Sequence, residues 1–266
     1  MERKWWQDKV CYQIWPKSFQ DSNGDGVGFL SNIIENHDEP RGASRYLPEE
    51  AANDPRAQKA LAAVQMLLPG LPFLYQGQEL GMTSTVFPSI DAVDDVNTRG
   101  EYAAALAAGL APGEALARVA RWSRDNARTP VQWTADHAAG FTTGTPWMAV
   151  NPNYTQVNVA AQQGVEGSVL EFYKSLIRLR KNDKYKEALV WGGFEPLHQD
   201  QRGLAAFVRA GGGRTLAVAS NLSGEPQRVE LPGTAKEVLL CSDGAPGLTG
   251  GILALAPWQA AVVELA

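Results

Sequence analysis

Residues 55–75 read Pro-Arg-Ala-Gln-Lys-Ala-Leu-Ala-Ala-Val-Gln-Met-Leu-Leu-Pro-Gly-Leu-Pro-Phe-Leu-Tyr. The first part, to about Leu68, predicts a helix, because Asn53 or Asp54 can cap its start and Pro55 suits the first helical position. Pro-Gly then ends the helix, and the apolar run 71–75 predicts a short strand that is buried on both faces. The stretch therefore predicts a helix that leads directly into a buried strand.

The segments before this stretch extend the pattern. Residues 9–15 alternate and are rich in β-forming residues, so they predict a strand. A polar, glycine-rich loop follows at 21–28, and residues 29–34 predict a second strand. The order strand, loop, strand, helix, strand is typical of a parallel α/β fold.

The segments after residue 82 change in character. An alanine-rich helical stretch around 101–122 is broken by Pro112-Gly113, and a loop-rich region follows to residue 163. Ser168 and Glu171 then have the spacing of a capping box, which predicts a helix over 168–181.

The C-terminal part predicts a small antiparallel β-sandwich, because short alternating segments are separated by turns. We expect strands at Ala188–Trp191, Leu204–Arg209, Thr215–Ser220, Arg228–Leu231, Glu237–Cys241, Ile252–Leu255 and Ala260–Leu265. The predicted domains are therefore 1–187 and 188–266.

Composition narrows the classes of function. The chain has 266 residues, 44% of them hydrophobic, and a formal net charge of −5, which gives no electrostatic reason to expect nucleic acid or a membrane as partner. The two cysteines and three histidines lack the spacing of a zinc site. No apolar run reaches the roughly 20 residues that cross a bilayer, and no signal-peptide core follows the N-terminus, so we expect a cytoplasmic protein.

Three polar clusters are candidates for chemistry. Glu35-Asn-His-Asp-Glu39 follows the strand at 29–34, and ligands of parallel α/β folds bind at that edge, although the cluster also suits a solvated loop. Arg124, Asp125 and Arg128 form a second cluster, which also suits a surface ion-pair network of little energetic value. Asp21-Ser-Asn-Gly-Asp-Gly26 matches the opening of a calcium loop, but Asn32 stands where the closing Glu belongs, so a plain Asx-rich turn explains it too.

Longer strings resemble glycoside hydrolase family 13, in the subgroup of oligo-1,6-glucosidase, dextran glucosidase and sucrose isomerase. The opening Lys9-Val-Cys-Tyr-Gln-Ile-Trp-Pro-Lys-Ser-Phe-Gln-Asp-Ser-Asn-Gly-Asp-Gly-Val-Gly28 resembles the start of those enzymes. Glu35-Asn-His-Asp-Glu-Pro-Arg41 resembles the motif after the seventh barrel strand, and Tyr75-Gln-Gly-Gln-Glu-Leu-Gly-Met82 resembles the eighth strand and its loop. Ser123-Arg-Asp-Asn-Ala-Arg-Thr-Pro-Val-Gln-Trp133 and the strings at 139–147 and 150–154 complete the match, which covers nearly the whole chain.

The resemblance implies an α/β fold that is part of a (β/α)8 TIM barrel, with strands 1, 7 and 8 and helices 7 and 8, followed by a β-sandwich. A complete barrel needs about 250 residues, whereas the predicted sandwich begins near residue 188. In the family, barrel strands two to six follow the first loop, but here Gly28 runs straight into the seventh-strand sequence at Phe29. The middle of the barrel is therefore absent by this interpretation.

The resemblance also implies roles for individual residues. Asp38 resembles the carboxylate that stabilises the transition state, and His37, Arg124 and Arg128 resemble substrate-binding residues. Asp21, Asn23, Asp25 and the carbonyl of Val27 resemble calcium ligands, with Phe29 at the family's next carboxylate position, so a calcium ion would bind weakly or not at all. The strings that carry the family's nucleophile and acid/base are absent from the sequence.

Three hypotheses about function follow. The favoured one is an α-glucosidase-family protein, related to enzymes that hydrolyse α-glucosidic bonds of oligosaccharides, with little or no activity of its own because a retaining glycosidase needs two carboxylates. In the second, surviving carboxylates such as Asp38, Glu35 or Glu79 take over. The third is a non-catalytic carbohydrate-binding or assembly module that uses the Trp and Arg residues of 122–147.

A barrel with missing strands also predicts self-association, because strand edges and apolar faces would be exposed. Linkage preference, the origin of the shortened barrel, residual activity and oligomeric state do not follow from the sequence.

Overall fold

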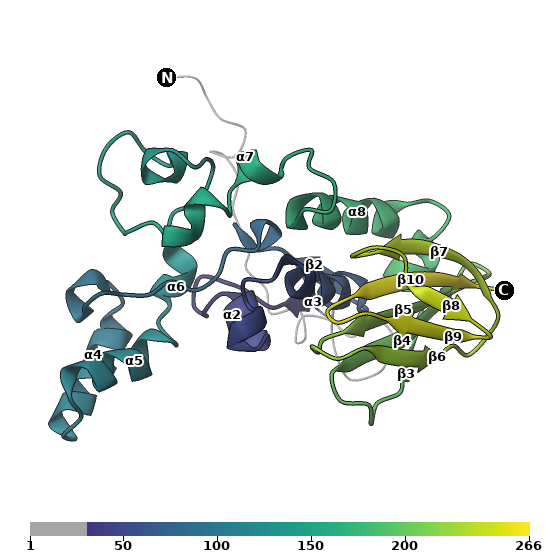
Figure 1. The fold of residues 1–266 in the computed structure, drawn as a ribbon, viewed down its shortest axis with the longest axis horizontal. Helices are drawn as coiled ribbons and strands as arrows, with labels where there is room; N and C mark the ends of the chain where they lie inside the picture. Colours follow the sequence, from purple (N-terminus) through teal and green to yellow (C-terminus); the bar gives the residue numbers. More distant parts are fainter. Residues whose placement is uncertain (1–30) are drawn as a thin grey trace, which may run out of the picture.

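The computed structural model describes residues 31–266. Figure 1 shows two parts: stacked β-strands at one end, and at the other a run of loops and short helices that carries a projecting helical hairpin. The helices α3 and α8 lie between them. The predicted strand at 9–15 and the glycine-rich loop at 21–28 lie outside the described residues.

The predicted strand–helix–strand unit is confirmed for the described residues, but the prediction that its second strand is buried on both faces is wrong, because Leu71 is 47% and Phe73 44% exposed. Strand β1 (Ser31–Ile33) and strand β2 (Leu71–Phe73) pair in parallel, with Ser31 opposite Leu71, and α3 (Pro55–Leu67) connects them. The side chain of Asp54 caps α3 by accepting a hydrogen bond from the Arg56 amide at 2.8 Å. A short helix, α2 (Gly42–Tyr46), and a 3₁₀ turn at Glu49–Ala51 fill the connection between β1 and α3.

The middle of the chain is mostly irregular. The predicted alanine-rich helix begins earlier than expected and forms a hairpin of α4 (Val96–Ala107) and α5 (Pro112–Ala120), separated where Pro112 starts the second helix. The remaining short helices are α6 (Asp125–Arg128) and α7 (Val159–Gln162), with 3₁₀ turns at Gln78–Leu80, Ile90–Ala92, His137–Gly140 and Pro152–Thr155.

Helix α8 (Val169–Lys181) begins as predicted at Ser168, whose hydroxyl accepts the amide hydrogen of Glu171 at 3.2 Å. The reciprocal half of the predicted capping box is not formed. The Glu171 carboxylate instead accepts the Gly164 amide at 2.9 Å and pairs with Lys174. The Glu171 carboxylate therefore accepts the Gly164 amide instead of the Ser168 amide, and this hydrogen bond connects the preceding turn to α8.

Two antiparallel sheets follow, as predicted. One has the order β3-β4-β5-β10-β7 and the other β6-β9-β8. Their strands are β3 (Gly193–Leu197), β4 (Leu204–Gly211), β5 (Arg214–Asn221), β6 (Gln227–Glu230), β7 (Ala235–Cys241), β8 (Gly247–Thr249), β9 (Ile252–Leu255) and β10 (Ala260–Leu265).

The prediction of a strand at 188–191 is wrong. Residues Glu187–Trp191 form a π-helical turn, and the first sheet strand begins at Gly193. Within this turn, Ala188 and Leu189 are fully buried and pack in the core that contains residues of α3 and α8. The apolar run that suggested a strand is therefore buried as part of a helical turn.

The central strands of the five-stranded sheet, β4, β5 and β10, are largely buried on both faces. One face packs on the three-stranded sheet through side chains such as Val229, Leu253 and Val263. The other contributes Phe207, Leu216, Val218, Ala260 and Val262 to a core shared with α3 and α8. The sheets therefore do not enclose their whole core alone, and the barrel-derived helices complete it. None of the helices within 31–266 is long and apolar enough to cross a membrane.

Candidate functional site

Asp38 lies in the loop that follows β1, at the edge where the parallel strands end. Its amide donates to the Asn36 side chain at 2.7 Å, which gives the loop a local turn. His37 is mostly exposed and places Nε2 3.1 Å from an Asp38 oxygen, while the Asp38 side chain is 54% exposed. Asp38 and His37 are therefore open to a ligand from solvent.

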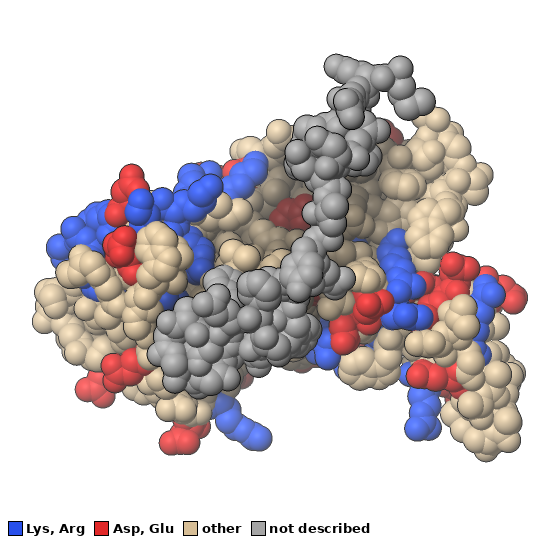
Figure 2. All heavy atoms as spheres, turned by 180° about the vertical axis from the view of Figure 1, so that it is seen from behind, with Lys and Arg blue, Asp and Glu red and all other residues tan. Residues whose placement is uncertain are grey.

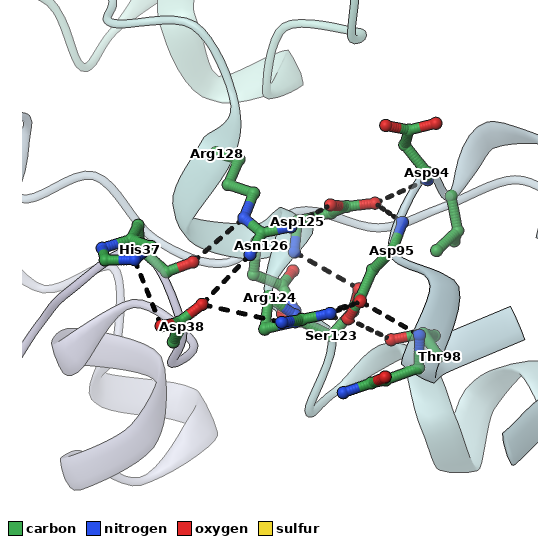
Figure 3. A network of polar contacts seen from close by, with 12 residues as sticks. His37, Asp38, Asp94, Asp95, Thr98, Ser123, Arg124, Asp125, Asn126 and Arg128 are labelled. Atoms are coloured by element: carbon green, nitrogen blue, oxygen red, sulfur yellow. Dashed lines mark hydrogen bonds and ion pairs between the residues drawn. The ribbon is translucent and has the colours of Figure 1, made fainter. Parts of the chain in front are cut away.

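Both predicted arginines come to this loop from the region of α6, about 90 positions away in the chain. Arg128 Nη2 lies 3.2 Å from Asp38 Oδ1, and Arg128 Nε donates to the His37 carbonyl at 3.0 Å. Arg124 Nη1 lies 3.7 Å from the same Asp38 oxygen. Figure 3 shows the carboxylate of Asp38 between His37 and the two guanidinium groups. The structure thus brings together the four residues that the sequence proposed.

A second carboxylate holds Arg124 in position. Arg124 Nε donates to Asp95 Oδ1 at 3.0 Å, and the Thr98 hydroxyl donates to Asp95 Oδ2 at 2.8 Å. Burial alone would raise the pKa of Asp95, but these hydrogen bonds and two backbone amides outweigh it and hold the pKa well below its usual range. Asp95 therefore stays ionised and anchors Arg124.

Asp125 supports the same arrangement from behind. Its Oδ2 accepts the amides of Asp94 and Asp95 at 2.6 and 2.8 Å, and its Oδ1 lies 3.6 Å from Arg128 Nη1. Asp95 and Asp125 are both almost fully buried, so this network differs from the loose surface ion pairs that the sequence also allowed. Its carboxylates at Asp95 and Asp125 are buried, whereas the Asp38 side chain at the other end is 54% exposed (Figure 3).

Sequence reasoning missed Asp95. A signal was available, since Asp95 stands directly before α4 and its side chain accepts the Asn97 amide at the helix start. The sequence analysis proposed helix caps only for the helices that begin near residues 55 and 168. Nothing close to Asp95 in the sequence indicated that Arg124 would be its partner.

Glu35 is not a partner for Asp38 at the open edge. It is buried, with Oε2 3.3 Å from Nη1 of the fully buried Arg41. Burial raises the pKa of Glu35 to about 6, against the opposing attraction of Arg41. Arg41 in turn donates to the Gln76 carbonyl at 2.6 Å and lies over the Tyr75 ring. The pair therefore fastens the loop after β1 to the loop after β2.

The arrangement can bind hydroxyl groups through a carboxylate, an imidazole and two guanidinium groups. The predicted calcium ligands Asp21, Asn23, Asp25 and Val27 lie outside the described residues, so that site stays a prediction. Within 31–266, no group of three or more His, Cys, Asp or Glu side chains could hold a metal ion.

Comparison with protein-family models gives two matches. Residues 29–192 match the catalytic domain of α-amylase, and residues 204–262 match the C-terminal domain of the α-amylase SusG. The boundary between the two matches falls near the start of the antiparallel sheets.

Individual relatives agree with these models. The chain is 39% identical over 225 residues to the probable oligo-1,6-glucosidase 3 of Bacillus subtilis, which covers 82% of this chain and 39% of that protein. It is 37% identical over 247 residues to the glucan 1,6-α-glucosidase of Streptococcus pneumoniae, which covers 93% of this chain and 45% of that protein. The chain therefore spans less than half the length of these relatives.

Solved structures share the fold. The trehalulose synthase MutB from Pseudomonas mesoacidophila superposes with a TM-score of 0.83 at 36% identity, over 90% of this chain and 44% of that one. An isomaltulose synthase of Erwinia rhapontici superposes with a TM-score of 0.81 at 34% identity, over 90% of this chain and 43% of that one.

Proposed function

Because this chain belongs to the α-amylase catalytic-domain family, we propose that it binds a glucosyl unit of an α-glucosidic oligosaccharide at Asp38 and hydrolyses it little or not at all. One observation carries the proposal: Arg128 contacts both the Asp38 carboxylate and the His37 carbonyl, at the open edge of the parallel strands. The relatives' names refer to glucosidases of 1,6-linked sugars, which supports a saccharide as the ligand.

Each residue has a role that its chemistry supports. The Asp38 carboxylate accepts hydrogen bonds from vicinal hydroxyl groups, and charge-assisted bonds of this kind are stronger than neutral ones. His37 offers a ring nitrogen to a neighbouring hydroxyl. Arg128 and Arg124 keep the carboxylate in one orientation and can donate to sugar oxygens through their remaining N–H groups.

Hydrolysis needs more than this site provides. A retaining glycosidase uses two carboxyl groups about 5–5.5 Å apart, one as nucleophile and one as acid/base. The family strings that would supply both are absent from the sequence, and Glu35 is committed to Arg41. Asp38 alone can favour positive charge at the anomeric carbon, but it cannot complete the double displacement.

Isothermal titration calorimetry with methyl α-D-glucopyranoside and isomaltose tests the binding step. We expect Asp38→Asn to weaken both by roughly tenfold or more, because it removes a charged acceptor. Glu39→Gln is the matched control, since Glu39 is the next residue but pairs with Arg45 at 2.5 Å, outside the network. Binding that is equal in wild type and Asp38→Asn would contradict the proposal.

A second candidate is a non-catalytic carbohydrate-binding or assembly module whose ligand contacts lie in the loop-rich region rather than at Asp38. The exposed tryptophans 122, 133 and 147 favour this candidate. The same titrations separate the two, since this module would bind saccharides with unchanged affinity after Asp38→Asn.

A further inference from the structure

An apolar groove of about 530 Å³ lies between β2, α8 and the turn at Glu187–Trp191. Its apolar lining is Met66, Leu71, Pro72, Leu74, Ile177, Val190 and Trp191. Trp191 is 68% exposed and Leu71 is 47% exposed. Large apolar side chains that are grouped on a surface mark a site of binding.

The charged side chains that line this groove are basic. They are Arg180, Lys181 and Lys186, and no carboxylate of the described residues joins them in the lining. Arg180 donates to backbone carbonyls rather than to a carboxylate, and Lys186 pairs with the exposed Asp183 at 2.5 Å. The groove therefore has an excess of positive charge, which favours a partner that is both apolar and acidic.

Another surface of the same chain has these two properties. The acidic loop, residues 85–96, contains three aspartates and no lysine or arginine. Val86 is 85% exposed and Val96 is 77% exposed, the highest values among the large apolar side chains that the structure describes. Asp91 and Asp94 are exposed between them. The loop therefore presents apolar and acidic groups together.

Helix α6 holds the acidic loop near both ends. The Thr85 amide donates to Asn126 Oδ1 at 3.1 Å, and the amides of Asp94 and Asp95 donate to Asp125 Oδ2 at 2.6 and 2.8 Å. Figure 3 shows the Asp94 carboxylate turned away from this network. Because its ends are fixed in the free chain, the loop loses less conformational entropy when it docks.

The groove and the acidic loop are complementary, but they cannot meet within one chain. Figure 1 places α8 beside the sheets, whereas the loop leads into α4, in the hairpin that projects at the other end. We propose that the acidic loop of one copy docks in the groove of a second copy. Val86 and Val96 then pack against its apolar wall, and Asp91 and Asp94 lie at its basic rim.

This contact joins unlike surfaces, so each copy in a pair keeps one groove or one loop free. Such contacts extend into a ring or an open chain of copies. Burial of apolar side chains supplies most of the stabilisation. The charges determine which surface enters the groove, because like charges that face each other across an interface are strongly unfavourable.

Reversal of the charges on one surface at a time tests the proposal. The loop variant is Asp91→Lys with Asp94→Lys, and the groove variant is Lys181→Glu with Lys186→Glu. In sedimentation velocity, each variant alone should have a dissociation constant raised by roughly tenfold or more. An equimolar mixture should associate again, because the unchanged loop of the groove variant fits the unchanged groove of the loop variant.

Asp200→Lys with Glu225→Lys is the matched control. Both residues are exposed in loops between strands, and the substitutions change the net charge as much as those of the loop variant do. The control should associate as the wild type does. Thermal unfolding of each variant shows that it is folded, and a misfolded variant would not recover association in the mixture.

Each other outcome refutes the proposal. If the loop variant alone associates as the wild type does, a different surface or a second groove fills the groove. If both variants are folded and monomeric but their mixture stays monomeric, the two surfaces do not contact each other. If the control loses association equally, net charge rather than this pair of surfaces governs it. A wild type that stays monomeric shows that the groove takes no second copy.

Discussion

Arg209 of β4 donates a hydrogen bond from Nη1 to the carbonyl of Leu67, the last residue of α3, at 2.9 Å. Its other nitrogens donate to the carbonyls of Gly192 and Gly193 at 3.0 and 3.1 Å. Within 31–266, no carboxylate pairs with this buried guanidinium. Burial, together with repulsion from Arg180, lowers its pKa to about 10. Carbonyl dipoles, one of them at the C-terminal end of α3, therefore stabilise the charge of Arg209 in place of a carboxylate.

Arg180 of α8 makes the same kind of contact from the other side. Its Nη1 donates to the carbonyls of Met66 and Leu189 at 2.9 and 3.1 Å. The two arginines thus satisfy the carbonyls at the C-terminus of α3, which otherwise lack partners. Through them the parallel part of the fold is fastened to α8 and to the five-stranded sheet.

We expect Arg209→Met to lower the free energy of unfolding by about 2–4 kcal/mol, because it takes the donor from the buried Leu67 carbonyl and from the partly buried carbonyl contacts at Gly192 and Gly193. The unfolding transition of the variant should have the same midpoint by far-UV circular dichroism and by tryptophan fluorescence, since α3, α8 and the sheet share one core. Arg202→Met is the control, because Arg202 is exposed in the turn before β4. A loss no larger than that of the control would contradict the role of Arg209.

Periodicity and capping predicted most of the elements for physical reasons that are local. The helix at 55–68 has its cap and its stop in the sequence, and strands such as Leu204–Gly211 and Ala260–Leu265 are short, mostly apolar runs that lie between turns. The apolar run 188–191 was wrongly predicted as a strand because a short buried helical turn and a short buried strand have the same apolar composition. The short β8, Gly247–Thr249, was missed because it is exposed and has no apolar face.

The candidate site was predicted only in part. Asp38, His37, Arg124 and Arg128 came from motifs, and the structure brings them together. Of their supports, Asp125 was part of the predicted cluster, but the pairing of Asp95 with Arg124 could not be found from sequence, because it spans 29 positions through the hairpin of α4 and α5.

Glu35 should give the stability of the chain an unusual pH dependence. Its folded pKa of about 6 lies above the ordinary value of 4.5, so between these values the folded state binds a proton that the unfolded state releases. The contribution of Glu35 to the free energy of unfolding should therefore fall by about 2 kcal/mol as the pH rises from 4.5 to above 6. Denaturant unfolding of wild type and Glu35→Gln across this range measures it, and the variant should gain relative stability with rising pH.

Glu264 provides a comparison of opposite sign. Burial alone would raise the pKa of Glu264, but hydrogen bonds from Arg214, Lys236, Lys184 and Tyr185 prevail and lower it to about 2. Wild type should therefore lose stability relative to Glu264→Gln as the pH falls from 4.5 towards 2. If wild type also loses stability relative to Glu35→Gln as the pH falls, the pKa of Glu35 is lowered by Arg41 rather than raised by burial, and the prediction is wrong.

The purified chain should not hydrolyse 4-nitrophenyl α-D-glucopyranoside above background. The missing nucleophile and acid/base normally supply most of a barrier reduction that exceeds about 8 kcal/mol in enzymes. Release of 4-nitrophenol over hours, with Asp38→Asn run in parallel, measures this. Turnover that disappears in Asp38→Asn would show that a surviving carboxylate acts in catalysis.

We also expect the chain to associate with a second copy through the apolar surface around β2 and α8. The exposed side chains include Leu71, Leu74 and Trp191, the last 68% exposed. A groove of about 530 Å³ runs between them, with Ile177 and Val190 in its wall and Lys181 and Lys186 on its rim. Figure 2 shows basic side chains gathered over this half of the molecule (upper left), on a chain whose formal net charge is −5.

A basic rim on an acidic chain favours contact between unlike surfaces of two copies, and the apolar groove supplies most of the stabilisation. Sedimentation velocity at increasing protein concentration should show association, and Trp191→Ser should shift the weight-average mass towards the monomer. Trp122→Ser removes a similarly exposed indole elsewhere and should leave the association unchanged. Because burial of apolar surface drives it, the association should persist when sulfate is added, whereas a contact held by charge alone would weaken. A chain that stays monomeric at all concentrations, or responds equally to both substitutions, would show that this surface is not where copies meet.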